Sequence, residues 1–194
     1  MSQRFDNTIR IVGDALRSVD DAVCEERVED CRVALANGHK IIASGLGKNV
    51  PVCEKFVGTM LSLGLNANFM HTNTAVHGDI GMVQPGDVVI ILTKSGATAE
   101  SVYLYDLLKE RDCVVWLLTF EKDSVLGRQM AKSLVVTLEH EGDQWNIMPN
   151  NSTTLNLIVL QTIAMELAVA LGISLPQFKK NHPGGHIGEV LRHG

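Results

Sequence analysis

One apolar run constrains the fold of this chain more than any other segment. Residues 88–92 read VVIIL, with no alternation of polar side chains. Such a run is typical of a parallel strand that is buried on both faces of its sheet. A polar turn follows at residues 93–100, and residues 101–111 have the composition of a helix. The order strand, turn, helix predicts an α/β fold.

The turn after this strand has two interpretations. Thr93, Ser95 and Thr98 supply hydroxyl donors, and Gly96 lets the backbone approach a ligand closely or adopt a positive φ. A helix N-terminus with free N–H groups attracts anions, so the turn could bind a phosphate. Alternatively, Ser95 or Thr98 simply caps the helix. The turn by itself does not decide between a phosphate site and an ordinary cap.

Composition narrows the class of protein. The 194 residues fit one domain, and 45% hydrophobic with 20% charged residues is ordinary for a globular protein. The net charge of −5 and the lack of a basic run argue against nucleic-acid binding. The four cysteines lack CxxC spacing, which favours reduced thiols over disulfides or zinc ligands. No secretion signal is visible, and the apolar segment 155–171 contains polar residues, so we expect a cytoplasmic protein without a membrane span.

The remaining segments predict a doubly wound sheet. Strands are expected at residues 40–43, 66–70, 114–119 and 132–138 in addition to 88–92, with helices between them. This alternation predicts a three-layer α/β fold of about five parallel strands flanked by helices, similar to flavodoxin. Residues 1–37 read as a helical arm of one or two helices, and residues 38–194 as the α/β core with a C-terminal histidine loop. We expect a single domain.

Several polar clusters follow the expected strands. They are the Gly-rich turn with Ser44, Gly47 and Lys48, the histidines His71 and His77, the turn 93–100, and the segment 139–141. Each alone is a weak signal, because a lone histidine is usually structural and a lysine usually solvated. Ligands of such sheets bind outside the carboxyl ends of the strands, where all of these clusters fall. Their convergence predicts a binding site there.

Five motifs in sequence order resemble one family. They read GLGK at 45–48, HGDIGM at 77–82, SGATAE at 95–100, NSTT at 151–154 and HPGG at 182–185. The set resembles the sugar isomerase (SIS) domain, and within it the arabinose-5-phosphate isomerases. The resemblance implies interconversion of D-ribulose 5-phosphate and D-arabinose 5-phosphate, which supplies Kdo (3-deoxy-D-manno-octulosonate) for lipopolysaccharide or capsule biosynthesis.

The resemblance also implies residue roles. The catalytic positions carry over onto Lys48, Glu100, Glu141 and His182, with Glu139 as the rival of Glu141. The implied substrate-binding residues are Ser44, Gly47, His77, Thr93, Ser95, Gly96, Thr98, Ser152 and Thr153. His71 matches a position where relatives can hold an inhibitory zinc ion.

Aldose–ketose isomerisation needs a carbon base, a group that stabilises the enediolate, and a phosphate anchor. We expect Glu141 to be the base, with a pKa raised by its closed site, and Glu100 to be its partner. The assignment between the two carboxylates is nearly open. Lys48 would stabilise the enediolate and His182 would relay oxygen-bound protons. No cofactor or metal is required for this chemistry.

Two departures from the family pattern stand out. The usual Ser-Asn-Ser-Gly-Glu turn here reads Thr93-Lys94-Ser95-Gly96-Ala97, which makes it more cationic. The paired CBS regulatory domains of most relatives do not follow, so we expect a stand-alone catalytic domain. Feedback control would then act at the active site, with CMP-Kdo as the ligand.

Other activities stay open at this point. Related SIS isomerases act on hexulose 6-phosphate or sedoheptulose 7-phosphate, and some SIS domains only sense phosphosugars. The HPGG loop favours the arabinose 5-phosphate type, and the retained catalytic residue types argue against a pure sensor. We expect a homo-oligomer, a tetramer by resemblance, in which the histidine loop serves the site of a neighbouring subunit.

Overall fold

A single parallel sheet forms the centre of the molecule. The computed structural model describes the backbone of residues 1–193 and the side chains of residues 1–191, so the expected domain end at Gly194 lies outside the described residues. Within them, five parallel strands lie in the order β2-β1-β3-β4-β5. Their bounds are Ile41–Gly45 for β1, Ala67–His71 for β2, Val88–Leu92 for β3, Val114–Thr119 for β4 and Ser133–Val135 for β5. The expected flavodoxin-like sheet is confirmed.

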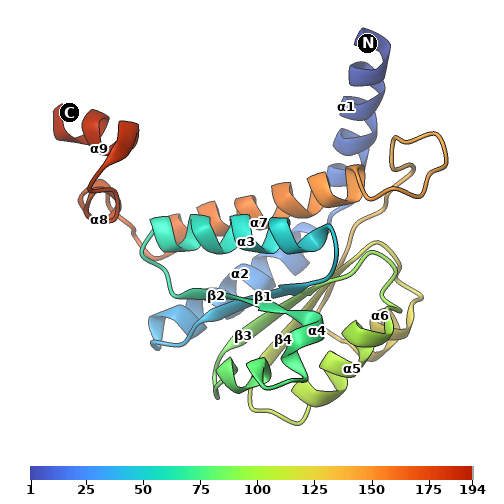
Figure 1. The fold of residues 1–194 in the computed structure, drawn as a ribbon, viewed down its shortest axis with the longest axis horizontal. Coiled ribbons are helices and arrows are strands. Elements are labelled where there is room, and N and C mark those ends of the chain that lie inside the picture. The colour runs from blue at the N-terminus through green and yellow to red at the C-terminus, as the bar shows by residue number, and fades with distance from the viewer. Residues whose placement is uncertain (194) are drawn as a thin grey trace.

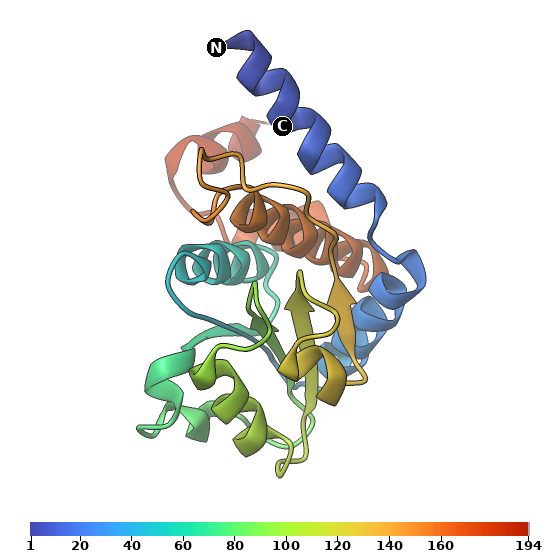
Figure 2. The ribbon, with the colours of Figure 1, turned by 90° about the vertical axis from the view of Figure 1, so that its right-hand side faces the viewer.

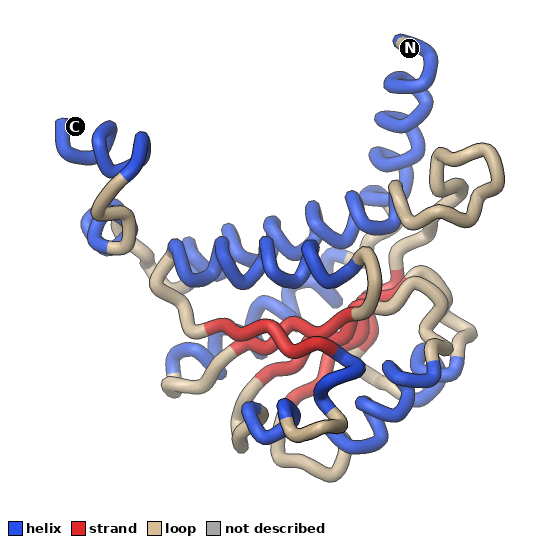
Figure 3. The backbone as a smooth tube through the Cα atoms, viewed as in Figure 1, coloured by secondary structure: helices blue, strands red, loops and turns tan. Residues whose placement is uncertain are grey.

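Helices cover both faces of this sheet (Figure 3). One face carries α2 (Asp21–Ala36), α3 (Asn49–Ser62) and α7 (Asn151–Ala170). The other carries α4 (Thr72–Ala75), the 3-10 helix η1 (Asp79–Met82), α5 (Ala99–Leu108) and α6 (Val125–Gln129). The helix α1 (Ser2–Arg17) projects from the body, and α8 (Leu175–Lys180) and α9 (Gly185–His193) lie beyond the far end of α7 (Figures 1 and 2).

Alternating strand residues divide the core between the two faces. In β3, Val88, Ile90 and Leu92 pack into the cluster that contains α3 and α7, whereas Val89 and Ile91 pack against α5. All five β3 residues are buried because side chains of a strand alternate between two covered faces. The unbroken apolar run in the sequence is therefore explained.

The structure decides the number of helices in the arm and shortens one expected strand. The arm contains two helices, because the side chain of Asp20 caps the second one by accepting hydrogen bonds from Ala22 N and Val23 N. The edge strand β5 is shorter than the expected 132–138, because Thr137 N donates to Ser18 Oγ at 2.9 Å and the chain leaves the sheet.

The helix α7 is long and apolar enough to cross a membrane by length and composition. In this structure it packs on α3 and the sheet, and Leu155, Leu160 and Leu167 are fully buried in the same core as α3. A core helix gives the same composition signal, and the packing accounts for its apolar character.

The order in which strands are added to the sheet reverses between β1 and β3, which are parallel. These strands are neighbours, with Gly45 opposite Leu92 at their carboxyl ends. The segment after β1 enters α3 on one face, and the segment after β3 enters α5 on the other face. Such a switch point opens a crevice where ligands bind in open α/β sheets.

Candidate active site

The turn after β3 gathers its hydroxyl groups in one place. Thr98 Oγ1 lies 3.4 Å from both Thr93 Oγ1 and Ser95 Oγ. Thr98 occupies the N-cap position of α5, but its side chain makes no capping hydrogen bond. Ser95 Oγ accepts only a 3.3 Å contact from Ala97 N within the turn. The hydroxyl of Thr98 thus makes no hydrogen bond that caps α5, which favours the anion-site interpretation left open by the sequence.

Gly96 is required by the shape of this turn. Its φ is +57°, and a Cβ there would lie 2.1 Å from Ser124 Oγ. Its carbonyl oxygen accepts a hydrogen bond from Leu126 N at 2.9 Å. The turn is therefore pinned against the segment after β4, which fixes the direction of the hydroxyl cluster.

The turn after β1 faces the same crevice. Gly47 has a φ of +56°, and Lys48 lies exposed at the start of α3. The next residue, Asn49, donates to Leu92 O at 3.4 Å and accepts from Asn156 Nδ2 at 3.0 Å. These two bonds tie the start of α3 to the end of β3 and to α7. Lys48 therefore lies at the same end of the sheet as the β3 turn.

Glu141 is the fully buried carboxylate of the site. Its Oε2 accepts hydrogen bonds from Asn150 N at 3.0 Å and Ser152 N at 2.9 Å, both at the start of α7. Free N–H groups at a helix N-terminus bind and stabilise a carboxylate. The segment carrying Glu141 is held in turn by Asn146, whose Oδ1 accepts from Glu141 N at 2.8 Å.

Lys94 supplies the opposite charge. Its Nζ lies 2.6 Å from Glu141 Oε1, and the Lys94 side chain is 41% exposed while that of Glu141 is 1% exposed. Burial would raise the pKa of Glu141. The Lys94 ammonium, the Ser152 hydroxyl and the N–H groups of Ser152 and Asn150 outweigh burial and hold this pKa below its ordinary value of 4.5. The expectation of a raised pKa at Glu141 is wrong, because the site surrounds the carboxylate with donors.

The rival carboxylate points elsewhere. Glu139 is exposed, and its Oε2 forms an ion pair of 2.8 Å with Arg10 of α1. Arg10 also lowers the pKa of Glu139. Glu100 is exposed in the first turn of α5, on the same edge of the sheet as Lys48. Of the segment 139–141, the structure brings Glu141 to the β3 turn.

Three residues expected to bind substrate have other partners. Ser44 is buried, and its Oγ lies 2.9 Å from Thr72 Oγ1, which joins the ends of β1 and β2. Ser152 is buried and gives its backbone N–H to Glu141. The hydroxyl of Thr153 donates to Asn150 O at 2.9 Å. Ser152 and Thr153 thus have partners at the start of α7, and Ser152 helps to hold Glu141, while their role as a phosphate anchor stays a prediction.

His182 lies far from these residues within one chain. The preceding Asn181 donates to Ser62 O at 3.2 Å, at the end of α3 opposite Lys48. With 1.5 Å of rise per residue, the length of α3 separates His182 from Lys48 by about 20 Å. Figure 1 shows α8 at the opposite end of α7 from the strand-end turns. One copy of the chain does not bring His182 to the other predicted catalytic residues.

The two other histidines predicted for the site lie at and after the end of β2. His71 caps α4, with Nδ1 accepting from Asn73 N at 3.2 Å, and His77 is exposed. Among the described residues, no group of three histidine, cysteine, aspartate or glutamate side chains is placed to hold a metal ion. Zinc binding at His71 stays a prediction.

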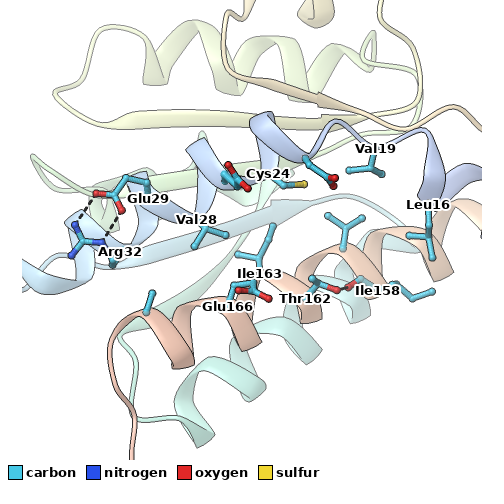
Figure 4. Close-up of a pocket in the computed structure, with 14 residues that line it drawn as sticks. Leu16, Val19, Cys24, Val28, Glu29, Arg32, Ile158, Thr162, Ile163 and Glu166 are labelled. Carbon is cyan, nitrogen blue, oxygen red and sulfur yellow. Dashed lines mark hydrogen bonds and ion pairs between the residues drawn. The ribbon is translucent and has the colours of Figure 1, made fainter.

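A groove with a volume of about 540 Å³ lies away from this site, between α2 and α7 (Figure 4). Apolar residues such as Val28, Ile158 and Ile163 line it, and the ion pair between Glu29 and Arg32 lies at one end. None of its lining residues is a predicted site residue.

Sequence reasoning missed the amide side chains that build the site. Asn49, Asn146, Asn151 and Asn156 all bond across segments, with Asn151 Nδ2 donating to His140 O at 2.8 Å. The Asn-rich segment before α7 was the available signal. Lys94 was noticed as a departure, but its pairing with Glu141 requires the fold.

The anchoring of Glu141 predicts a pH-dependent stability. A pKa that is lower in the folded than in the unfolded state adds stability above the unfolded pKa, and this stability is lost as the pH falls through the folded pKa. We expect Glu141→Gln to lower the free energy of unfolding by about 2 kcal/mol at pH 7. The difference from wild type should shrink below pH 4.5, the ordinary pKa of the group. Urea unfolding at several pH values measures it, with the exposed Glu139→Gln as control. A difference that stays constant from pH 7 to pH 4 would contradict the anchored carboxylate.

Known proteins resemble this chain over most of its length. The SIS domain matches residues 34–169. A Pseudomonas aeruginosa protein named arabinose 5-phosphate isomerase KdsD is 32% identical over 197 residues, which cover 98% of this chain and 60% of the relative. A Francisella tularensis protein of the same name is 29% identical, over 95% of this chain and 57% of the relative.

This chain therefore spans about three fifths of the length of these relatives. A protein of E. coli CFT073, solved in complex with arabinose 5-phosphate, superposes with a TM-score of 0.83 at 27% identity and covers 94% of this chain and 95% of its own. Because the SIS domain matches well over half of the sequence and the observed sheet agrees with it, the chain belongs to the SIS domain family.

Proposed function

We propose that this chain is a phosphosugar isomerase that interconverts D-arabinose 5-phosphate and D-ribulose 5-phosphate. The observation that carries the proposal is the buried, ionised Glu141 beside a hydroxyl-rich turn at the switch point of the sheet. Similarity to proteins named arabinose 5-phosphate isomerase over nearly the whole chain, and to a protein solved with arabinose 5-phosphate, supports the choice of sugar.

The groups at the crevice suit the steps of this reaction. The phosphate would bind at Thr93, Ser95 and Thr98, whose hydroxyls cluster beside the N-terminus of α5. A carboxylate then removes the proton from C2 of the aldose and returns a proton to C1, with the charge developing on an enediolate oxygen. Lys48 stabilises that charge from the β1 turn. Neither proton transfer needs a metal or cofactor.

Glu141 is our candidate for the carbon base. It is buried, ionised and held in place by the N–H groups at the start of α7. Glu100 is exposed at the start of α5, where solvent can supply and accept protons. We therefore assign Glu100 the role of partner for oxygen-bound protons.

A panel assay tests the reaction and the base together. We expect turnover with arabinose 5-phosphate or ribulose 5-phosphate to exceed turnover with hexulose 6-phosphate and sedoheptulose 7-phosphate. Glu141→Gln should lower kcat by about two to four orders of magnitude, the usual contribution of a positioned base. Glu139→Gln is the matched control and should keep turnover near wild type. Loss of activity in the control alone would transfer the role to Glu139, and binding without turnover of any sugar would favour a sensor.

We also propose that two copies of the chain complete one site. His182 lies at the far end of α3 from Lys48, so it can reach a crevice only on a neighbouring copy. Apolar side chains are exposed on the projecting elements, with Phe5 and Ile9 on α1 and Ile187 and Val190 on α9. These side chains suit burial in a homo-oligomer, and a tetramer is the proposed state.

Subunit mixing tests this arrangement. Lys48→Ala and His182→Ala should each be inactive alone, since each copy then lacks one group in every site. Mixed under conditions of subunit exchange, the two variants should recover part of the wild-type activity. Some sites then receive Lys48 from the His182→Ala copy and His182 from the Lys48→Ala copy. Activity that does not recover, despite exchange demonstrated by mass spectrometry of mixed oligomers, would contradict the shared site.

A biological role follows from the proposed reaction. Supply of Kdo for lipopolysaccharide or capsule, a cytoplasmic location and feedback by CMP-Kdo remain proposals. An acidic sugar nucleotide presents its phosphate to the same donors as the substrate, so its inhibition would be competitive with the sugar phosphate.

A further inference from the structure

The ion pair between Lys94 and Glu141 links the predicted phosphate site to the predicted base. Lys94 lies in the same turn as Ser95 and Thr98, one residue from the first hydroxyl of that cluster. Its ammonium reaches Glu141, which is 47 positions later in the chain. The Lys94 side chain therefore connects the turn where the phosphate would bind to Glu141, the predicted base.

We propose that Lys94 is a positioning residue that neutralises Glu141 in the free protein and moves its charge to the substrate's phosphate when substrate binds. Glu141 would then lose the cation with which it pairs in the described structure, at the moment when it is needed as a base. The inference rests on the proposed isomerase function and adds a residue and a coupling to it.

The geometry leaves Lys94 free to move and Glu141 fixed. The Lys94 side chain is 41% exposed, and its backbone is held by Thr119 Oγ1 and Phe120 N, which both bond to Lys94 O at 3.1 and 3.2 Å. Glu141 is 1% exposed, and two backbone N–H groups hold its Oε2. A flexible side chain on a fixed turn can exchange one anion for another without moving the base.

The contact itself is a charge contact that leaves Oε1 without an aligned hydrogen bond. Oε1 is buried, and among the described residues no hydrogen-bond donor with suitable geometry reaches it, although Lys94 Nζ is 2.6 Å away. This buried oxygen therefore has lone pairs that no described donor uses. Once the ammonium leaves, Oε1 has no described partner and is the oxygen left to accept a proton.

The charged groups around Glu141 are few. Lys94 faces it from the β3 turn, and the start of α7 presents only N–H groups and the Ser152 hydroxyl. His140 turns its Nδ1 to Gly142 N at 2.9 Å, and Asp143 bonds with its own segment at Ile147 N and Met148 N. Removing the charge of Lys94 therefore removes the one ion pair of Glu141 in the described structure. One of the contributions that lower the pKa of this carboxyl is then lost, so the pKa rises toward the value that burial favours.

The experiment follows the Glu141 carboxyl directly, by 13C NMR titration of glutamate-labelled protein, with Glu141→Gln assigning the signal. In wild type we expect a pKa below 4.5 in the free protein, rising when saturating inorganic phosphate is added. In Lys94→Met the pKa of the free protein should already be raised, and the affinity for phosphate should fall about tenfold. Lys94→Arg, which keeps the charge, should behave as wild type.

Lys40 provides a matched control elsewhere in the fold. Its Nζ lies 2.6 Å from Asp87 Oδ2, and the Asp87 side chain is 1% exposed, as in the Lys94 pair. This pair lies beside the amino ends of β1 and β3, away from the crevice. Lys40→Met should lower stability without moving the Glu141 titration or the binding of phosphate.

Activity adds a second readout. In Lys94→Met the acid limb of the kcat/KM profile should shift to higher pH, with KM raised more than kcat is lowered. An unchanged Glu141 titration in Lys94→Met, or a wild-type pKa that phosphate leaves unchanged or lowers, would overturn the role of Lys94. If the titration behaves as expected but no sugar phosphate is isomerised, the coupling stands and the proposed function falls.

Discussion

The buried carboxylate of Glu141 joins three parts of the chain that are distant in sequence. It accepts N–H groups from the start of α7 and pairs with Lys94 of the turn after β3, while its own segment follows β5. Buried charges are stable only when they are paired and hydrogen-bonded. The same contacts that make burial of this group tolerable therefore fix the position of α7 relative to the crevice, and with it the distance between the base and the hydroxyls of the β3 turn.

The parallel sheet determines what can gather at that crevice. β1 and β3 are neighbours whose following helices cover opposite faces, and ligands of open α/β sheets bind at such a switch point. The same architecture sends α3 and α7 away from the crevice, and their ends carry α8 and His182 to the opposite side (Figure 1). A site that uses His182 must be completed by another copy. The lengths of these two helices are the reason for proposing that the site is shared between copies.

Much of the fold was readable in the sequence because local signals and burial agreed. The run at β3 is apolar throughout because both faces are covered, and the turn after it was found because hydroxyls and Gly96 stand directly at the strand end.

The choice between Glu139 and Glu141 could not be made from the sequence. Both glutamates follow the same strand, so their positions in the sequence do not distinguish them. The ion pair that holds Glu139 away from the site joins it to Arg10, 129 positions earlier in the chain. The pKa of Glu141 was unpredictable for a related reason. Burial and donors act in opposite directions, and two of the four donors are backbone N–H groups that no sequence pattern displays. Ser152 illustrates the limit: its side chain suggested a phosphate anchor, but its backbone N–H holds the carboxylate.

The central claim is that Glu141 exchanges a carbon-bound proton of a pentose phosphate at this crevice. Incubating the protein with arabinose 5-phosphate in heavy water, and following the sugar by NMR, tests it most directly. We expect ribulose 5-phosphate with deuterium at C1 and slow deuteration at C2 of the remaining aldose, with both nearly abolished in Glu141→Gln. Ketose and deuterium at wild-type rates in Glu141→Gln, or neither in the wild-type protein, would contradict it.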